Sequence, residues 1–361
     1  MLDEYKNKII QGDCIEILKK FPEKSIDLIF ADPPYNLQLQ KELWRPNNTK
    51  VNAVNDEWDK FSNFEEYDKF CLGWLKECKR VLKDNGTIWV IGSYHNIFRV
   101  GKIMQDIGFW ILNDILWIKT NPMPNFKGTR FNNAHETLIW AAKNKNSKYT
   151  FHYKTMKAFN DDSQMRSDWY IPICNGSERI RINGKKAHST QKPESLLYRI
   201  IISTSNIGDI ILDPFIGSGT TGVVAKKLGR NFIGIEKEEF YIEIANERIK
   251  KIDSYNQNTL FYPLEIKKPK VSFGNLIEVG LIKPSEELFS YNCKYVAEVL
   301  ANSTIVSGDL IGSIHYVSAH LLGKTTNNGW TFWYVKRDDK LISINDLRNE
   351  YIKNLTFFKN Y

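Results

Sequence analysis

The chain has 361 residues, which is enough for one large domain together with a smaller one. Lysine and arginine outnumber aspartate and glutamate by 50 to 42, so the net charge is +8, and aromatic residues make up 13% of the sequence. This balance favours a polyanionic partner over an acidic small molecule.

The cysteines and histidines carry no metal or disulfide signature. The five cysteines include no CxxC pair, and the six histidines lack the spacing of metal ligands. We therefore expect no disulfide framework and no metal, as in a reducing cytoplasm. The N-terminal residues contain no apolar signal segment, and no window approaches 18 uninterrupted apolar residues. The sequence predicts a cytoplasmic protein without a membrane span.

The first part of the chain predicts two strands, 8–14 and 26–30, with a helix over 15–21 between them. Asp13 follows the first strand and is equally a candidate for a helix N-cap and for a binding residue. The second strand leads into Asp32-Pro33-Pro34-Tyr35. We expect this tetrapeptide in the loop at the carboxyl end of its strand, where open α/β sheets bind their ligands.

The tetrapeptide combines a carboxylate, two rigid carbonyls and an aromatic ring. Each proline fixes its φ near about −65° and restricts the residue before it, so the carbonyls of Asp32 and Pro33 are held in place. With these acceptors on its two hydrogens, the amino group of a nucleobase can turn its lone pair toward an electrophile. Tyr35 offers a flat face for the base. A plain turn is the alternative, because Asp and Pro are common in turns.

Residues 36–63 lose hydrophobic periodicity and predict a long loop over the mouth of the tetrapeptide loop. Arginine can meet phosphates, and tryptophan can stack on or wedge between bases. We therefore expect DNA contacts from Trp44, Arg45 and Trp58. A packed surface loop is the alternative for any one of them.

Helices and strands then alternate, which predicts βαβ units and a parallel sheet. The expected helices cover 64–82 and 97–107, and the expected strands cover 87–92, 114–118 and 136–141.

Two irregular and basic stretches follow these strands. Residues 121–132 contain further candidates for DNA contacts, Lys127 and Arg130. Residues 143–186 interleave basic and aromatic side chains, which suits nucleic acid. Within them, the alternation of Tyr149, Phe151 and Tyr153 predicts one face of a strand.

A glycine turn comes late in the chain, in Asp213-Pro214-Phe215-Ile216-Gly217-Ser218-Gly219-Thr220. Together with Gly222 its glycines match G-x-G-x-x-G, and Glu236 stands where an acid commonly binds ribose. A nicotinamide-dependent dehydrogenase is therefore one alternative. Asp213 argues against it, since a carboxylate beside the turn repels pyrophosphate and attracts a cationic ligand.

S-adenosylmethionine satisfies both motifs. It has an adenosine for Glu236, a sulfonium and an ammonium for acidic residues such as Asp213, and an electrophilic methyl group for an amino group held at Asp32. Because the turn does not open the domain, we expect a circularly permuted strand order. The strands that bear Asp32 and Asp213 would then be neighbours, with both loops at one edge of the sheet.

Together the two motifs resemble the amino-methylating DNA methyltransferases of the β group. The aspartate-headed tetrapeptide resembles adenine-N6 enzymes, whereas serine-headed versions are typical of cytosine-N4 enzymes, the closest alternative. Further matches are similar to the GANTC-methylating, cell-cycle-regulated type: Gly12-Asp13-Cys14, Asn132-Asn133-Ala134-His135-Glu136 and His188-Ser189-Thr190-Gln191-Lys192-Pro193.

The resemblance implies the fold, the reaction and the site. It implies a circularly permuted, Rossmann-like α/β sheet with helices on both faces, and methyl transfer from S-adenosylmethionine to a flipped-out adenine. The catalytic residues would be Asp32, Pro33, Pro34 and Tyr35. Asp13 would contact the cofactor's adenine and Glu236 its ribose. The whole implied cofactor site is Asp13, Ser189, Thr190, Gln191, Lys192, Asp213, Phe215, Gly217, Gly219, Thr220 and Glu236.

We expect a catalytic domain over 1–252 with a target-recognition region at about 119–187, a linker over 253–272, and a small α+β domain over 273–361. Asn-Gly in the last domain predicts a hairpin turn, and Asn328 and Trp330 are candidates for DNA contacts. This domain resembles an extra domain of the GANTC group that is thought to hold DNA. A structural or dimer-supporting module is the alternative, and a homodimer is compatible with the sequence.

Overall fold

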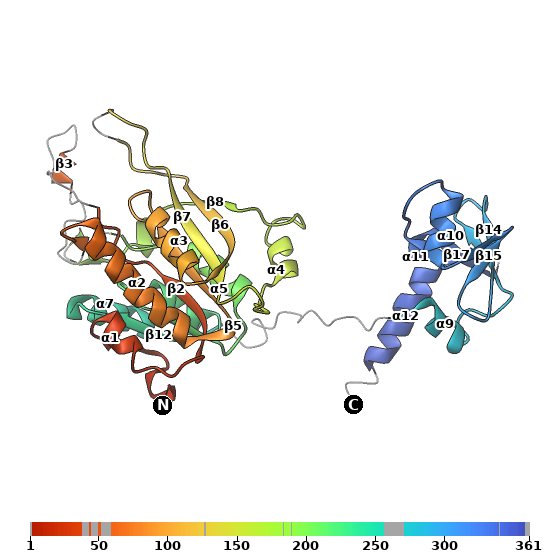
Figure 1. Ribbon diagram of the computed structural model, residues 1–361, viewed down its shortest axis with the longest axis horizontal. Coiled ribbons are helices and arrows are strands. Elements are labelled where there is room, and N and C mark those ends of the chain that lie inside the picture. The colour runs from red at the N-terminus through yellow and green to blue at the C-terminus, as the bar shows by residue number, and fades with distance from the viewer. Residues whose placement is uncertain are drawn as a thin grey trace. The chain divides into compact units, whose positions relative to one another are not determined.

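The computed structural model describes residues 2–37, 43–44, 50–51, 59–125, 128–182, 184–188, 190–255, 271–338 and 340–357. The chain divides into two compact units, Met1–Tyr262 and Pro263–Tyr361, and each is described by itself (Figure 1). Among the described residues, no helix has both the length and the apolar character that crossing a membrane requires.

An eight-stranded sheet forms the centre of the first unit, in the order β1-β12-β11-β2-β5-β7-β6-β8. The middle strands are apolar runs buried on both faces, as expected where helices cover both sides. The strands are β1 (Lys8–Gln11), β2 (Ile26–Ala31), β5 (Leu82–Gly92), β6 (Trp110–Lys119), β7 (His135–Ala142), β8 (Asp168–Ile171), β11 (Ile210–Asp213) and β12 (Asn231–Glu236).

Helices pack on both faces of this sheet. Side chains of α1, α2 and α3 belong to one apolar cluster, and side chains of α5 and α6 belong to the other. In Figure 1, α1, α2 and α3 lie together in front of the sheet. The helices of the unit are α1 (Cys14–Leu18), α2 (Phe64–Val81), α3 (Ile97–Asp106), α4 (Tyr153–Ala158), α5 (Glu194–Thr204), α6 (Thr220–Lys227) and α7 (Glu239–Lys250), with 3-10 turns η1 (Asp3–Tyr5) and η3 (Gly176–Glu178).

The strand order confirms the circular permutation. β11 pairs in parallel with β2, through Ile211 with Leu28 and Leu212 with Ile29. β12 pairs in parallel with β11 and with β1. Because the carboxyl ends of parallel strands meet at one edge, the loop after β2 and the turn after β11 are neighbours.

The expectation of a wholly parallel sheet is wrong for β7. This strand runs antiparallel to both β5 and β6. In the described part of residues 120–134, which connect β6 to β7, no crossover helix occurs, and the two strands pair as an antiparallel hairpin. β5 is parallel to β2, and β6 therefore ends, and β7 begins, at the edge where β2 ends.

The expected strand through Tyr149, Phe151 and Tyr153 is also wrong. α4 begins at Tyr153, and the two preceding aromatic residues lie outside any strand. The rings of Tyr149 and Phe151 pack on Trp140 of β7, with centroids 5.4 and 5.5 Å away. Their alternation therefore serves packing against one tryptophan. Two small antiparallel pairs complete the unit: β3 (Leu43–Trp44) with β4 (Lys50–Val51), and β9 (Arg181–Ile182) with β10 (Lys185–Lys186).

The second unit is an antiparallel sheet of six strands with helices, built around its own apolar core. Trp333 is fully buried in this core, and its indole N–H donates to the carbonyl of Ile314. The strands are β13 (Glu287–Ser290), β14 (Val296–Val299), β15 (Ile305–Ser307), β16 (Leu310–Gly312), β17 (Trp333–Arg337) and β18 (Lys340–Ser343). The helices are α9 (Phe273–Glu278), α10 (Ile314–Leu321), α11 (Gly329–Phe332) and α12 (Ile344–Phe357).

The Asn-Gly sequence of the second unit does not form the expected hairpin turn. Asn328 is the N-cap of α11, and its side chain accepts a hydrogen bond from the amide of Trp330. Asparagine is favoured at both turns and N-caps, so the dipeptide alone did not distinguish them.

Candidate active site

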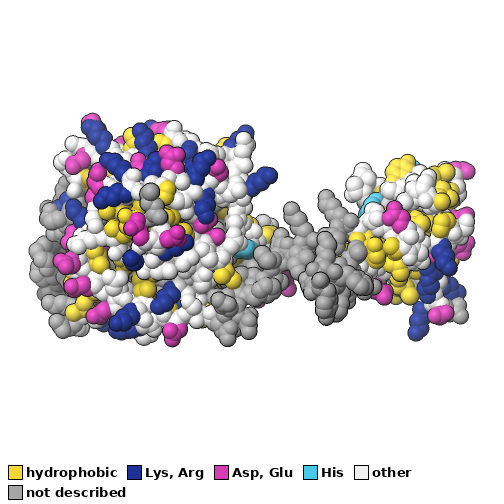
Figure 2. Space-filling view, turned by 90° about the horizontal axis from the view of Figure 1, so that it is seen from below, with side chains coloured by type: hydrophobic (Ala, Val, Ile, Leu, Met, Phe, Trp, Pro, Cys, Tyr) yellow, Lys and Arg dark blue, Asp and Glu magenta, His cyan; other side chains and the backbone are white. Residues whose placement is uncertain are grey.

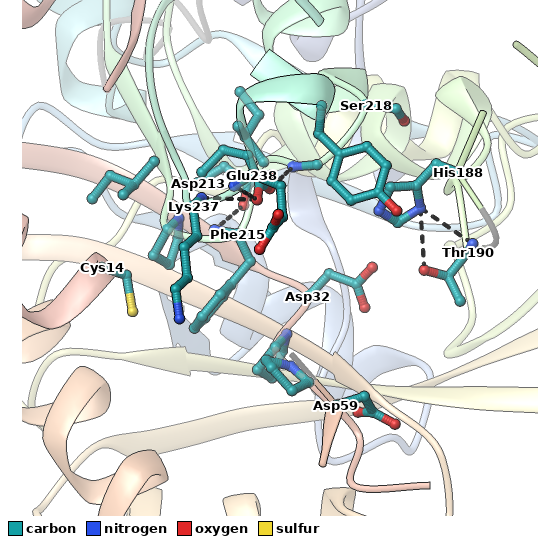
Figure 3. A pocket seen from close by; sticks show the side chains of 18 of the residues that line it. Cys14, Asp32, Asp59, His188, Thr190, Asp213, Phe215, Ser218, Lys237 and Glu238 are labelled. Carbon is teal, nitrogen blue, oxygen red and sulfur yellow. Dashed lines mark hydrogen bonds between the residues drawn. The ribbon is translucent and has the colours of Figure 1, made fainter. Parts of the chain in front are cut away.

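A cavity of about 360 Å³ opens at the edge where β2, β11 and β12 end (Figure 3). In this view Asp32, Phe215 and Thr190 surround one space, although they come from distant parts of the chain. The cavity is lined by most of the residues that the sequence placed in the site: Asp13, Asp32, Pro33, Pro34, Tyr35, Thr190, Gln191, Lys192, Asp213, Phe215, Gly217, Thr220 and Glu236.

The glycine turn between β11 and α6 has the backbone that its sequence suggests. Gly217 and Gly219 have φ values of 50° and 82°, which side chains rarely allow. A Cβ at Gly219 would lie 2.8 Å from the Cβ of Ala245, so this glycine lets α7 pack against the turn. Gly217 lines the cavity, whereas Gly219 stands behind it and shapes the turn.

Asp213, at the end of β11, is buried at the base of the turn. One of its oxygens accepts from the amide of Phe215 at 3.0 Å, and the other accepts from the hydroxyl of Thr221. Burial raises the pKa of Asp213 to about 7. A carboxylate held in low dielectric gains strongly from a cationic ligand, and the cavity supplies room for one.

Glu236 ties the turn to the end of β12. Its oxygens accept from three backbone amides: that of Gly217 at 3.0 Å, that of Lys237 at 2.8 Å and that of Glu238 at 3.0 Å. Burial raises the pKa of Glu236. The residue lines the cavity, and its contact with a ribose stays a prediction.

Asp13 is the N-cap of α1 and also lines the cavity. Its carboxylate caps α1 by accepting from the amides of Ile15 and Glu16, at 2.9 and 3.2 Å. The same residue lines the cavity, so capping does not exclude binding. Its contact with an adenine remains a prediction.

Residues 188 and 190–192 form another wall of the cavity. Gln191 bonds the backbone at Glu178 and Ile180. His188, which sequence reasoning gave no separate role, accepts from the amide of Thr190, and its ring packs on Tyr241 with centroids 4.5 Å apart. Burial lowers the pKa of His188 to about 4. Ser189 lies outside the described residues.

The tetrapeptide joins a buried cluster of charges. The ammonium of Lys192 lies 2.7 Å from Oδ2 of Asp32 and 5.3 Å over the ring of Tyr35. The hydroxyl of Tyr35 is 3.0 Å from Oδ1 of Asp32 and 3.1 Å from Oε2 of Glu136. Glu136 in turn binds Lys119 at 2.7 Å. The sequence places Glu136 in the motif 132–136 but does not indicate a role for it, because the pairing of β6 with β7 is a feature of the tertiary structure.

Burial and the neighbouring ammonium groups shift the pKa values of the carboxyl groups in this cluster in opposite directions. Burial raises the pKa of Asp32, although the neighbouring ammonium of Lys192 opposes the shift. Burial also disfavours the charged form of Glu136, but Lys192 and Lys119 outweigh it and hold the pKa of Glu136 below its ordinary value.

Asp59, which also lines the cavity, holds the end of the tetrapeptide loop. Its carboxylate accepts from the amides of Tyr35, Asn36 and Leu37 at 2.6, 2.8 and 2.9 Å. The hydroxyl of Tyr67 on α2 donates to the carbonyl of Pro34 at 2.8 Å. Sequence reasoning missed Asp59, since an aspartate in an irregular stretch carries no signal of what it binds.

For most residues of the first unit that we expect to contact DNA, the structure does not describe the side chain. Arg45, Trp58 and Lys127 are outside the described residues, and Trp44 is described only as part of β3. Arg130 is exposed and donates to the hydroxyl of Tyr94 at 2.9 Å. On the face of the first unit seen in Figure 2, Lys and Arg side chains lie among Asp and Glu side chains, so charge does not mark a DNA surface on this face.

The expected DNA contact at Trp330 is wrong. Its side chain is only 8% exposed in the core of the second unit, under the guanidinium of Arg348, whose central carbon lies 4.4 Å from the ring centroid. Asn328 uses its side-chain oxygen to cap α11. Among the described residues, no group of three His, Cys, Asp or Glu side chains has the arrangement of a metal site.

The two units match two families. The DNA methylase family matches residues 26–247, and the family described as Restriction Enzyme Adenine Methylase Associated matches residues 254–356. Type II methyltransferase M.HinfI of Haemophilus influenzae is 52% identical over 351 residues, which cover 97% of this chain and 98% of M.HinfI. Type II methyltransferase M2.LlaDCHI of Lactococcus lactis subsp. cremoris is 46% identical over 248 residues, which cover 68% of this chain and 90% of the relative.

The structure of M1.HpyAVI in complex with SAM is similar with a TM-score of 0.51 and 29% identity, over 67% of this chain and 98% of that one. Since the family match covers more than half of the chain and M.HinfI is similar along nearly all of it, the protein belongs to the DNA methylase family.

Proposed function

We propose that the protein is a site-specific DNA methyltransferase that transfers the methyl group of S-adenosylmethionine to N6 of an adenine in GANTC. The observation that carries the proposal is the parallel pairing of β11 with β2, which puts the glycine turn and the tetrapeptide around one cavity. The relation to Type II methyltransferases supports site-specific methylation. The adenine assignment rests on the aspartate that heads the tetrapeptide, and GANTC rests on resemblance to the GANTC group.

The chemistry of the cavity fits S-adenosylmethionine, which supplies an electrophilic methyl group when bound. The buried carboxylate of Asp213 suits its positive charge, and the ring of Phe215 offers an apolar surface for the adenine. Membership of the DNA methylase family and the SAM complex of M1.HpyAVI support this donor. The residues that we assign to it are Asp13, Ser189, Thr190, Gln191, Lys192, Asp213, Phe215, Gly217, Gly219, Thr220 and Glu236.

Two acceptors of the tetrapeptide position the amino group of the adenine. We assign one hydrogen to the carboxylate of Asp32 and the other to the carbonyl of Pro33, because Tyr67 already binds the carbonyl of Pro34. Tyr35 supplies an aromatic face for a base taken out of the duplex. No strong base is required, since the nitrogen becomes cationic on transfer and loses its proton afterwards.

DNA binding is divided between the two units in this proposal. The catalytic domain covers residues 1–252 and includes the target-recognition region at about 119–187. The linker over 253–272 joins it to an accessory DNA-binding domain over 273–361. The family match over 254–356 supports a restriction-related role for the second unit. Removing residues 273–361 should weaken binding to site DNA, and unchanged affinity would end this role.

The biological setting follows from the relatives. The designation Type II of M.HinfI and M2.LlaDCHI supports a place in a restriction–modification pair. The cell-cycle-regulated role of the GANTC group is the second candidate, and it predicts a host without a GANTC-cleaving endonuclease. We propose a cytoplasmic location, where DNA is accessible, and a homodimer, which sedimentation of the purified chain tests.

The function is tested with the purified chain, tritium-labelled S-adenosylmethionine and a duplex that contains one GANTC site. We expect label in the duplex and in N6-methyladenine after digestion to nucleosides. A duplex with GANTC changed to GTNTC is the control and should stay unlabelled. Label in N4-methylcytosine would establish the cytosine alternative, and absence of label from both duplexes would refute methylation of GANTC by this chain.

A further inference from the structure

Both oxygens of the Asp32 carboxylate are engaged in the structure. Oδ2 accepts from Lys192 at 2.7 Å, and Oδ1 accepts from the hydroxyl of Tyr35 at 3.0 Å. Asp32 and Lys192 are largely buried, with side chains 18% and 8% exposed. A carboxylate oxygen can accept more than one hydrogen bond, but an incoming amino group has to share the Asp32 carboxylate with these two donors unless one of them gives way.

Glu136 is placed to receive both donors. Its Oε2 lies 3.9 Å from the ammonium of Lys192 and 3.1 Å from the hydroxyl of Tyr35. Its other oxygen is held by Lys119, 2.7 Å away. The second carboxylate thus faces the same two groups that occupy Asp32.

The pairing of β6 with β7 fixes this second carboxylate in place. Lys119 ends β6 and Glu136 lies next to the start of β7, and the register pairs Trp117 with Glu136 and Ile118 with His135. The cluster contains two ammonium groups, those of Lys119 and Lys192, and two carboxylates, those of Asp32 and Glu136. Because a buried charge without a partner is very costly, Asp32 can lose these donors only as the amino group of the substrate replaces them.

We propose that Glu136 is a positioning residue that takes over Lys192 and the Tyr35 hydroxyl when the adenine enters, and so frees Asp32 to accept the amino hydrogen. This inference rests on the proposed function. A movement of Lys192 by about 1 Å shortens the 3.9 Å separation to that of a charge-assisted hydrogen bond. Lys192 and Tyr35 keep a carboxylate partner throughout, and the substrate gains the oxygen that they leave.

The Glu136→Gln substitution tests this role, because it keeps the shape and removes the charge that attracts Lys192. Single-turnover methylation of the GANTC duplex should slow by about 10- to 100-fold, the usual effect of losing a hydrogen bond to a charged group. Dissociation constants for S-adenosylmethionine and for the duplex should change by less than about threefold. Glu77→Gln is the matched control: Glu77 is also partly buried and paired with an arginine, outside the cavity.

A double-mutant cycle with Lys192→Met separates positioning from structural support. Without the ammonium only the Tyr35 hydroxyl remains for Glu136 to draw away from Asp32, so Glu136→Gln should slow the Lys192→Met variant by a clearly smaller factor than it slows the wild type. Equal fold-losses in both backgrounds would overturn the proposal, and so would a wild-type rate for Glu136→Gln alone.

Two further measurements apply if Glu136→Gln does not fold or if the wild type does not methylate the duplex. If Glu136→Gln does not fold, Glu136→Asp replaces it, since the shorter side chain keeps the charge and loses the reach to Lys192. A slow Glu136→Asp with normal ligand binding supports the inference, and a wild-type rate ends it. Methylation of the duplex by the wild type separates this result from the proposed function: without it the function itself is refuted, and with it only the role of Glu136 is at stake.

Discussion

The carboxylate of Asp59 accepts a hydrogen bond from the backbone amide of Tyr35 at 2.6 Å, across 24 positions of the sequence. The same carboxylate accepts from the next two amides, so it binds the end of the tetrapeptide as an anion binds a nest of N–H groups. The loop that presents Asp32 is therefore held by this carboxylate, in addition to the stiffness of its prolines.

Replacement of Asp59 by asparagine should loosen this loop. The amide nitrogen of asparagine cannot accept, so at least one backbone N–H loses its partner at a cost of about 1–3 kcal/mol of stability. We expect methyl transfer to fall by about 10- to 100-fold, because positioning of Asp32 depends on the loop. Urea unfolding and single-turnover methylation measure the two effects. Asp106→Asn on the exposed surface of α3 is the control, and equal behaviour of the two variants would contradict the role of Asp59.

Substitution of Asp32 by alanine should abolish transfer while the protein still binds S-adenosylmethionine. The carboxylate orients the amino group, and its loss should cost at least about a hundredfold in rate. Circular dichroism and calorimetric titration of the methyl donor check the fold and the pocket. Normal methylation by this variant would refute the assignment of Asp32.

Substitution of Gly219 by alanine should disturb the glycine turn. Its φ is 82°, and the new Cβ would lie 2.8 Å from that of Ala245, so strain and overlap together should cost about 2–5 kcal/mol. Gly208→Ala is a close control, because Gly208 has a φ of 85° and no atom within 4 Å of its added Cβ. Thermal unfolding should show the larger loss for Gly219→Ala, together with weaker binding of S-adenosylmethionine; equal losses would mean that contact with α7 is unimportant.

The raised pKa of Asp213 gives binding and stability opposite dependences on pH. The folded protein holds a proton on Asp213 up to about pH 7, whereas the unfolded chain releases it near the ordinary aspartate pKa of 3.8. The folded state therefore binds more protons between about pH 4 and 7, and the contribution of Asp213 to the free energy of unfolding falls as pH rises through that range.

Binding of a cationic ligand should favour ionised Asp213, so affinity for S-adenosylmethionine should rise from about pH 6 to about pH 8. Calorimetric titration at several pH values tests this, with Asp213→Asn as the comparison. The variant should bind with a smaller dependence on pH. The same dependence in both proteins would show that another group titrates.

Substitution of Arg130 by alanine tests the contact to DNA from the loop between β6 and β7. If the exposed guanidinium meets a phosphate, affinity should fall about equally for GANTC and for unrelated duplexes. The slope of log K against log salt should also decrease by about 1. Fluorescence anisotropy at several salt concentrations measures both. An unchanged slope would remove Arg130 from the DNA surface.

Local patterns in the sequence determined the elements and the chemistry that they carry. Apolar runs and helical periodicity predicted β2, β11, α2 and α3, because burial of one face or of both is written in the residue order. The tetrapeptide and the glycine turn indicated an acceptor for an amino group and a nucleotide site, since proline and glycine restrict or permit specific backbone geometry whatever surrounds them.

Only the tertiary structure decided which distant side chains meet. The antiparallel β7 brought Glu136 to the cluster of Asp32 and Lys192, Asp59 closed on the amides after Tyr35, and Trp330 went into a core instead of to a surface. These contacts join residues far apart in sequence, and each depends on strand order and packing, which no short stretch of sequence encodes. For that reason the type of chemistry could be predicted from the residues, whereas the partners that position it could not.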